Sequence, residues 1–341
     1  MTDRAGSGPP GGALVVGAGM SGISCASALA DAGQPVRIVD RGRVLGGRMA
    51  SRRLRDTGTQ WDGRIVDYGA SYFTARHPDF VALVRSLVEE GVVREWTDAF
   101  HVADPEGLLG LRVGPMRYAA PGGLRSIVEH LARQRDLSVE SQHVVESVRP
   151  VQSGSGLELD IDGERVLGAA LCMPGPQAQR IVEPSLVPSE IGELTWEPVI
   201  AVTMVFPDRS WPELDGAFVN DSPVLTWLAD DGRRRGDGAP VLVAHVNPVL
   251  AAHHLDDPQA VAPAAIAATR RILGITDLPS WAWAHRWSLA RPLTAVEADF
   301  ATAPMGRLAY AGDAFASGPR VEAAWLSGRS AGNWLATSLA R

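Results

Sequence analysis

The sequence predicts an α/β fold with two domains, one built on a parallel sheet and one on a mixed sheet. The chain has 341 residues, more than one ordinary domain, and 45% of them are apolar, enough to fill two cores. A strand, a glycine-rich turn, a helix and a second strand follow one another near the amino end, and a strand with a final helix closes the chain. We therefore expect a discontinuous, Rossmann-like domain assembled from both ends of the sequence.

The amino-terminal unit is complete within about 30 residues. Residues 13–16 form an apolar strand, residues 23–32 a helix that ends before Gly33, and residues 36–39 a strand that leads into Asp40. The turn between them reads Gly17-Ala18-Gly19-Met20-Ser21-Gly22. A lone Gly-x-Gly-x-x-Gly is weak evidence, but with this strand, helix and acidic residue around it the motif is typical of a dinucleotide site.

Each part of this turn has a task in holding a dinucleotide. Gly17 permits the tight turn, Gly19 lets the backbone approach a pyrophosphate, and Gly22 lets the helix pack closely on the strand. The helix amino end offers free N–H groups to the phosphates, and Asp40 would accept hydrogen bonds from ribose hydroxyls. The unit by itself suits NAD and FAD equally well.

Two further segments favour FAD. Leu45-Gly46-Gly47-Arg48 resembles the Gly-Gly-Arg of the glutathione-reductase and amine-oxidase superfamily, in which the chain passes the FAD pyrophosphate and Arg48 would neutralise phosphate charge. The strand 307–311 with Gly312-Asp313, followed by a helix from Val321, resembles the second half of that site. The helix amino end would then face the flavin and stabilise negative charge on its reduced form. No cysteine lies near residues 312–322, so we expect FAD to be bound non-covalently.

Further elements are expected in the rest of the chain, and they fall in both domains. We expect helices at 78–90 and 124–133, three short strands in 143–173 with a turn at Asp162-Gly163, and a long helix near 258–273. Residues 1–11 are expected to be a disordered tail. The expected limits are 11–75, 120–180 and 300–341 for the FAD-binding domain, and 76–119 and 181–299 for the substrate domain.

The whole chain resembles the bacterial renalase-like flavoproteins. The segments that carry the resemblance are 17–25, 46–53, 67–76, 211–222 with Trp227, 241–245, 285–287 and 320–328. The resemblance implies an oxidase that returns isomeric dihydronicotinamide nucleotides, the 2- or 6-dihydro forms of NAD(P), to NAD(P). Hydride would pass to the flavin, and O2 would take the electrons to give H2O2. The chain departs from that family at Ser71, Ala323, residues 246–250 and Ser288, mostly where the substrate is expected.

The expected site residues fall into two sets. Tyr72, Phe73, Trp227, His245 and Arg286 are the candidates for positioning the donor, although a core role suits the aromatic residues and His245 about equally well. Trp287 is a further candidate, and Arg291 shares a strand with Arg286. The residues expected to bind FAD are Gly17, Gly19, Met20, Ser21, Gly22, Asp40, Arg41, Gly47, Arg48, Tyr68, Gly69, Ala70, Val145, Gly312, Asp313, Val321, Glu322 and Ala323. Charged, solvated loops are expected at Arg52, Arg53 and Arg55 and at Arg233-Arg234-Arg235.

Composition excludes several other roles. All 32 basic residues are arginine, so no lysine can form a Schiff base or act as a general base. The net charge of −7 gives no indication of a nucleic-acid-binding surface and no reason to expect a membrane partner. Cys25 and Cys172 lie in apolar runs and are expected in the core, with no metal site. The absence of a signal-peptide centre and of long apolar runs favours a cytoplasmic protein.

Two alternatives stay open at this point. One is a flavin amine oxidase or desaturase acting on a specialised metabolite; amine oxidases often place a lysine near the flavin, and this chain has none. The other is a flavin-binding protein without turnover, serving as a partner or sensor.

Overall fold

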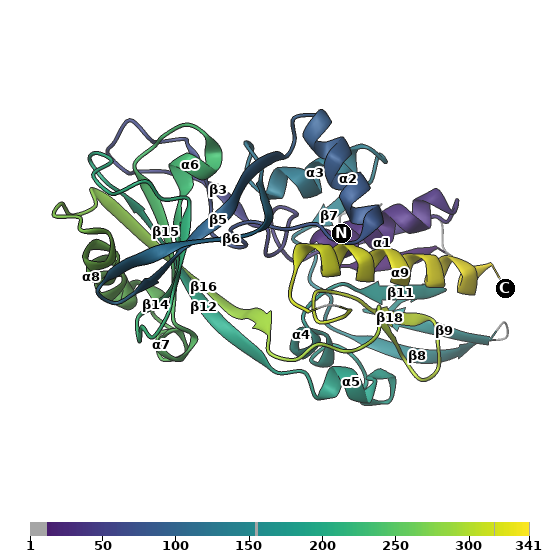
Figure 1. The fold of residues 1–341 in the computed structure, drawn as a ribbon. Coiled ribbons are helices and arrows are strands. Elements are labelled where there is room, and N and C mark those ends of the chain that lie inside the picture. Colours follow the sequence, from purple (N-terminus) through teal and green to yellow (C-terminus); the bar gives the residue numbers. More distant parts are fainter. Residues whose placement is uncertain (1–11, 154–155, 317, 341) are drawn as a thin grey trace. The chain divides into compact units, whose positions relative to one another are not determined.

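A computed structural model describes residues 12–153, 156–316 and 318–340 (Figure 1). The chain divides into two compact units, Met1–Gly47 with Val128–Thr195 and Pro292–Arg341, and Arg48–Ile127 with Trp196–Arg291. The predicted α/β fold class, with a Rossmann-like part and mixed sheets, is confirmed. The predicted disordered tail, residues 1–11, lies outside the described residues. The functional domain limits expected from the sequence stay a prediction.

The first unit is built on a six-stranded sheet in the order β17-β18-β11-β1-β2-β7. Its strands are parallel except β17, which runs antiparallel to β18. The sheet strands are β1 (Ala13–Val16), β2 (Val36–Asp40), β7 (Val139–Ser141), β11 (Gly168–Leu171), β17 (Ala301–Thr302) and β18 (Leu308–Tyr310). The helices of this unit are α1 (Met20–Asp31), α4 (Gly175–Gln179), α5 (Ser189–Gly192), α9 (Val321–Leu339) and a 3-10 turn at Pro184–Leu186, and α3 (Arg125–Arg133) contains the chain boundary between the units.

A separate antiparallel sheet in the first unit corrects one expectation. Residues 143–173 form four strands rather than three: β8 (Val148–Ser153), β9 (Gly156–Ile161) and β10 (Glu164–Val166) in the small sheet, and β11 in the large one. The predicted Asp162-Gly163 turn is confirmed, because Ile161 pairs directly with Glu164 and both turn residues have positive φ, 53° and 88°.

Helices α1 and α9 lie side by side in the first unit (Figure 1). Two glycines of α9 permit this approach. A Cβ on Gly328 would lie 2.0 Å from the carbonyl oxygen of Ser21, and a Cβ on Gly332 would lie 2.4 Å from that of Cys25. The Ser24 hydroxyl also donates to the Trp325 carbonyl at 2.7 Å. The glycine-rich start of α1 is thus held in place by the last helix of the chain.

The second unit is built on a seven-stranded mixed sheet in the order β16-β12-β15-β14-β13-β5-β6. Strands β13 and β5 are parallel, whereas β12–β15, β15–β14, β14–β13 and β5–β6 are antiparallel. The strands of this sheet are β5 (Arg94–Asp104), β6 (Gly107–Ala119), β12 (Trp196–Val205), β13 (Gly216–Val219), β14 (Leu225–Asp230), β15 (Val241–Val246) and β16 (Trp281–Pro292). Strands β3 (Ser51–Arg53) and β4 (Ile65–Asp67) form a separate two-stranded antiparallel sheet. The helices are α2 (Pro78–Glu89), α6 (Asp231–Arg235), α7 (Pro248–Ala252) and α8 (Ala262–Leu273), the last preceded by a 3-10 turn at Pro258–Val261.

The two faces of this sheet carry different kinds of side chain. Strand side chains alternate between faces, and Ile200, Val202 and Met204 of β12 are buried in the core cluster that also contains Ala265 and Ile272 of α8. The residues between them on β12 lie on the opposite face. That opposite face collects the aromatic and polar side chains described below.

The close approach of α1 and α9 generates the first prediction. We expect Gly328→Ala to lower the free energy of unfolding by about 1–3 kcal/mol, because the new methyl group must displace the α1 backbone at Ser21. Gly192→Ala is the matched control, since a Cβ there would meet no atom within 4 Å. Urea unfolding of the two variants measures the effect. A Gly328→Ala protein as stable as the control variant would mean that the helices do not depend on this contact.

Candidate functional site

The glycine-rich turn of the first unit leaves its backbone bare of side chains. Gly17 has φ +105°, and a Cβ there would lie 2.5 Å from the Cys172 carbonyl oxygen, so only glycine fits. A Cβ on Gly22 would lie 1.7 Å from the Gly17 carbonyl oxygen. Gly19 faces Gly47, whose Cα lies 3.8 Å from the position of a Cβ on Gly19. The two predicted glycine motifs therefore meet through backbone atoms, with no side chain between them. Such bare backbone is what a cofactor phosphate needs for a close approach.

Asp40 holds this turn from the end of β2. Its carboxylate accepts hydrogen bonds from the backbone N–H groups of Ala18 and Gly42, both at 2.6 Å. Each oxygen keeps a lone pair for a further donor. Ser21, in the first turn of α1, has a buried hydroxyl oxygen with no hydrogen-bond partner among the described residues. Of the other residues expected here, Met20 and Val145 are buried and Arg41 is exposed.

The carboxyl-terminal segment brings the second predicted set into the same unit. Gly312 follows β18, and its N–H donates to the Ser327 hydroxyl of α9 at 3.0 Å. Asp313 is half-buried, and α9 begins at Val321 with Glu322 and Ala323 buried in its first turn. Bare glycines, an unsatisfied hydroxyl at a helix amino end and carboxylates after two strands fit a bound FAD on the side of this unit.

Both cysteines are in the core, as predicted. Cys25 and Cys172 are buried free thiols. The Cys172 side chain hydrogen-bonds with Cys25 and, together with burial, raises the pKa of the Cys25 thiol well above its usual value. Neither thiol is available to attach a flavin.

In the second unit, two indole groups of the large sheet hold the segment 67–73 by hydrogen bonds. The indole Nε1 of Trp287 donates to the Tyr68 carbonyl at 2.8 Å, and that of Trp227 donates to the Ser71 hydroxyl at 3.0 Å. Gly69 has no room for a side chain, because a Cβ would lie 2.0 Å from the Arg48 carbonyl oxygen, and the Ala70 N–H donates to that same oxygen at 2.9 Å. This packing orients the side chains of Tyr68 and Tyr72.

A buried ion network supports the same segment and corrects an expectation. The solvated loop expected at Arg233-Arg234-Arg235 is wrong for two of its members, since the side chains of Arg234 and Arg235 are 1% and 5% exposed. Arg234 ion-pairs with Asp231 and donates to the Ser71 carbonyl at 2.8 Å. Arg235 binds Asp67 at 2.7 Å. These arginines are structural and hold the 67–73 segment.

Seven rings gather on the face of the large sheet opposite α8. This aromatic face consists of Tyr68, Tyr72, Phe100, Trp227, Trp283, His285 and Trp287. Tyr72 lies 5.1 Å from Phe100 and 5.6 Å from Trp227 between ring centroids. Tyr68 stacks on Trp287 at 5.6 Å and meets His285 edge-on at 4.8 Å.

Guanidinium groups lie over this face. Arg52 is centred 3.8 Å from the Trp283 ring and Arg117 is centred 4.2 Å from the Phe100 ring. The solvated loop expected at Arg52 is therefore wrong, whereas Arg53 and Arg55 are exposed as expected. Arg117, Trp283 and His285 were not among the site residues expected from the sequence, although His285 lies in the segment 285–287 that carries the resemblance. The alternation Trp281-Ala-Trp283-Ala-His285-Arg-Trp287 could have indicated that one face of β16 carries aromatic rings.

Two candidate donor-binding residues lie elsewhere. Phe73 is 4% exposed and packs against Phe80 and Tyr118, apart from the aromatic face. Arg286 alternates with His285 and Trp287 along β16, so it lies on the other face, where it donates to the Leu255 carbonyl. Arg291, further along β16, is paired with Glu197. The structure thus groups Tyr72, Trp227 and His245, and separates Phe73 and Arg286 from them.

His285 of the aromatic face and the neighbouring His245 are both held neutral. Burial, assisted by the charge of Arg234, lowers the pKa of His245 to about 4. Burial, with Arg52 and Arg286, lowers that of His285 to about 4. His245 lies beside Trp227 across the β14–β15 ladder, and its Nε2 is buried with no partner among the described residues.

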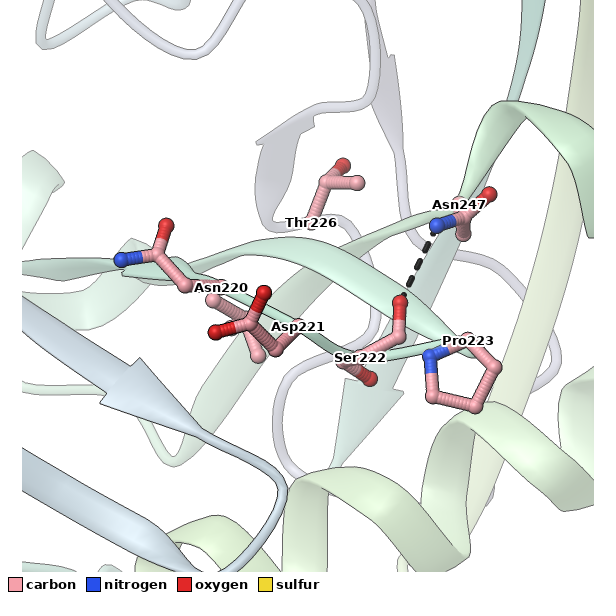
Figure 2. A pocket seen from close by; sticks show the side chains of 7 residues that line it. Asn220, Asp221, Ser222, Pro223, Thr226 and Asn247 are labelled. Carbon is pink, nitrogen blue, oxygen red and sulfur yellow. Dashed lines mark hydrogen bonds between the residues drawn. The ribbon is translucent and has the colours of Figure 1, made fainter.

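A shallow depression of about 720 Å³ lies at the ends of β13, β14 and β15. Figure 2 shows its lining residues, Val219, Asn220, Asp221, Ser222, Pro223, Thr226 and Asn247. The Asn247 amide donates to the Ser222 carbonyl at 3.0 Å, and its oxygen accepts from the Val249 N–H. Because these polar groups serve the local turn, the aromatic face is the stronger candidate for the donor site.

The described residues contain neither a metal-binding cluster nor a helix that could span a membrane. Within 12–153, 156–316 and 318–340, no group of three or more His, Cys, Asp or Glu side chains could hold a metal ion. In the same part of the chain, no helix combines the length and apolarity needed to cross a bilayer.

The position of Asp40 and Asp313 generates a prediction about FAD affinity. We expect Asp40→Ala and Asp313→Ala each to weaken FAD binding about ten- to a hundredfold, because each loses hydrogen bonds to a charged group worth roughly 1.5–3 kcal/mol. Titration of the apoprotein with FAD measures the change, and the exposed Asp277→Ala is the control. Affinities equal to wild type in both variants would mean that the cofactor lies elsewhere.

The buried state of His245 generates a prediction about pH. Its pKa is lower in the folded protein, about 4, than the ordinary value of 6.5, so its contribution to stability is complete above pH 6.5 and is lost as the pH falls towards 4. That difference corresponds to roughly 3 kcal/mol. We expect His245→Asn to flatten the fall in unfolding free energy between pH 7 and 4, whereas the exposed His253→Asn should retain it. Identical pH profiles for both variants would contradict a buried, neutral His245.

Comparison with known proteins places the chain in a family. Residues 15–87 match the NAD(P)-binding Rossmann-like domain, and residues 105–333 match flavin containing amine oxidoreductase. Similar solved structures include a proposed protoporphyrinogen oxidase from Exiguobacterium sp. 255-15, with 16% identity, a TM-score of 0.74, and coverage of 98% of this chain and 100% of the other. Cyclohexylamine oxidase from Brevibacterium oxydans IH-35A has 15% identity, a TM-score of 0.72 and coverage of 98% and 100%. Putrescine oxidase, solved with putrescine, has 16% identity, a TM-score of 0.70 and coverage of 97% and 100%.

These structural similarities show the fold, and the match over 105–333 shows the family. The Gly-rich turn, Asp40 and the start of α9 are the residues of this chain that fit its cofactor. The chain belongs to the flavin containing amine oxidoreductase family and is an FAD-dependent oxidoreductase.

Proposed function

We propose that the protein is an FAD-dependent oxidase of isomeric dihydronicotinamide nucleotides. The donor would be 2- or 6-dihydro-NAD(P), which loses a hydride to become NAD(P), while O2 with that hydride and one proton becomes H2O2. The observation that carries the proposal is the aromatic face, whose rings are accompanied by guanidinium groups and neutral histidines. When bound, FAD would supply the acceptor for the hydride and the route of the electrons to oxygen.

The charges around the aromatic face favour an anionic donor. Arg52 and Arg117 lie over its rings. Burial lowers the pKa of each, but guanidinium groups stay protonated in proteins. The buried carboxylates nearby, Asp67 and Asp231, are both bound by arginines of the ion network. A nucleotide phosphate gains from this positive field, whereas an alkylammonium group is repelled by it.

The chemistry asked of the side chains is modest. A dihydropyridine loses hydride readily, so the protein must mainly hold a flat ring in a reactive position and keep water away. Tyr72, Trp227 and Trp287 offer ring surfaces for this stacking. His245 and His285 are neutral at pH 7, which suits a reaction that requires no strong acid at the donor ring.

Amine oxidation is the second candidate. It is favoured by the family match and by the likeness to proteins named for putrescine and cyclohexylamine. An aromatic surface would suit the hydrocarbon part of such an amine. Against it stand the arginines over the face and the lack of any lysine in the sequence.

Anaerobic mixing of the FAD-loaded protein with each donor tests the proposal. We expect the 2- and 6-dihydro isomers of NAD(P)H to bleach the flavin band within seconds, at least one of them much faster than the ordinary 4-dihydro form. Putrescine, cyclohexylamine and catecholamines should leave the band unchanged, because the face repels cations. Admission of air should restore the colour with formation of H2O2. Bleaching by an amine, with none by any dihydro isomer, would replace this proposal with amine oxidation.

A further inference from the structure

We propose that Arg117 is an anion anchor on the aromatic face and binds a phosphate of the donor. The identity of the donor rests on the proposed function, whereas the binding of an oxyanion at this residue can be tested without it. Arg117 lies in β6, outside every motif from which the fold and the cofactor were predicted.

Arg117 is a buried cation that forms no ion pair among the described residues, although the carboxylate of Asp98 acts on its charge at longer range. The residue is 8% exposed, and its Nη1 atom is fully buried with no hydrogen-bond partner among the described residues. Arg64, Arg234 and Arg235 show the contrast, since each of these buried guanidinium groups ion-pairs with Asp231. Burying an unpaired charge is costly, and buried polar groups normally find partners. A ligand with an acceptor group would satisfy this buried Nη1 atom.

A second unsatisfied donor stands beside the same ring. Phe100 has the Arg117 guanidinium 4.2 Å from its ring centre and the Trp96 ring 5.3 Å away, edge-on. The indole Nε1 of Trp96 is also buried without a partner among the described residues. Both groups are donors only, so the complementary group on a ligand is an acceptor, and the positive charge of Arg117 selects a negative one.

The strand is shaped to place this guanidinium. The β5–β6 ladder shifts register between Thr97 and Ala99, so that Thr97 pairs with Arg117 and Ala99 with Val113. Within the shifted stretch, a Cβ on Gly114 would lie 2.8 Å from Nη2 of Arg117. The absence of a side chain at Gly114 thus leaves the space that the guanidinium occupies. Tyr72, whose ring lies 5.1 Å from Phe100, borders the anchor on the side of the 67–73 segment.

Donors that differ only in their phosphate test the anchor. We would compare Arg117→Gln, Arg117→Lys and the exposed Arg112→Gln of the same strand, all loaded with FAD. The donors are 2- or 6-dihydronicotinamide mononucleotide, which carries one phosphate, and the corresponding riboside, which carries none. We expect Arg117→Gln to raise the apparent Kd of the mononucleotide about ten- to a hundredfold and to leave the riboside unchanged. Arg117→Lys should recover part of the loss, and Arg112→Gln should behave as wild type. Equal effects on both donors, or none, would overturn the anchor.

A titration with inorganic phosphate separates this inference from the proposed function. In the FAD-loaded wild-type protein, phosphate should raise the midpoint of thermal unfolding and shift tryptophan fluorescence, because Trp96 lies beside the anchor. Arg117→Gln should lose both responses, and Arg112→Gln should keep them. If no dihydronicotinamide donor bleaches the flavin but these responses appear, the proposed function fails and the anchor stands. Absence of the responses in wild type, or their persistence in Arg117→Gln, would overturn the anchor itself.

Discussion

The buried pairing of Asp231 with three arginines is the interaction on which the second unit depends. Asp231 is fully buried and ion-pairs with Arg64 at 2.5 Å, with Arg234, and with Arg235 at 3.3 Å. Burial alone would raise the pKa of Asp231, but the three guanidinium groups hold it well below its usual range. Removing one partner from such a network leaves an uncompensated buried charge, which is why the pairing fixes a conformation.

That constraint reaches the aromatic face through the backbone of residues 67–73. Arg234 donates to the Ser71 carbonyl, and Arg235 binds the Asp67 carboxylate, which also accepts the Ser51 hydroxyl and the Leu124 N–H. Tyr68 and Tyr72 are thereby placed against rings that project from β14 and β16. In the first unit a different constraint does the equivalent work, because glycines at the α1–α9 contact and in the turn after β1 permit backbone approaches that no side chain allows.

The sequence was most informative where backbone conformation determines the structure. The turn after β1, the acid that ends β2, the Asp162-Gly163 hairpin and the last helix follow from glycine, capping and period-two rules. It was least informative about charged residues. Arg233-Arg234-Arg235 has the composition of a solvated loop, and the partners that bury Arg234 and Arg235 lie far away in the sequence. Arg286 was expected to contact the donor because of its position on a strand. Side chains alternate along β16, so Arg286 lies on the face of the sheet that does not carry His285. The sequence around Arg117 does not reveal its role, because the lack of a hydrogen-bond partner for its Nη1 atom depends on the folded surroundings.

The central claim is that the donor lies on the aromatic face of the seven-stranded sheet. A crystal structure of the FAD-loaded protein soaked with a nicotinamide nucleotide tests this most directly, because it locates the ring independently of turnover. The account predicts a nicotinamide ring stacked among Tyr72, Trp227 and Trp287. A nucleotide seated instead in the depression at Asn220 and Asn247, or on the face that carries α8, would contradict it.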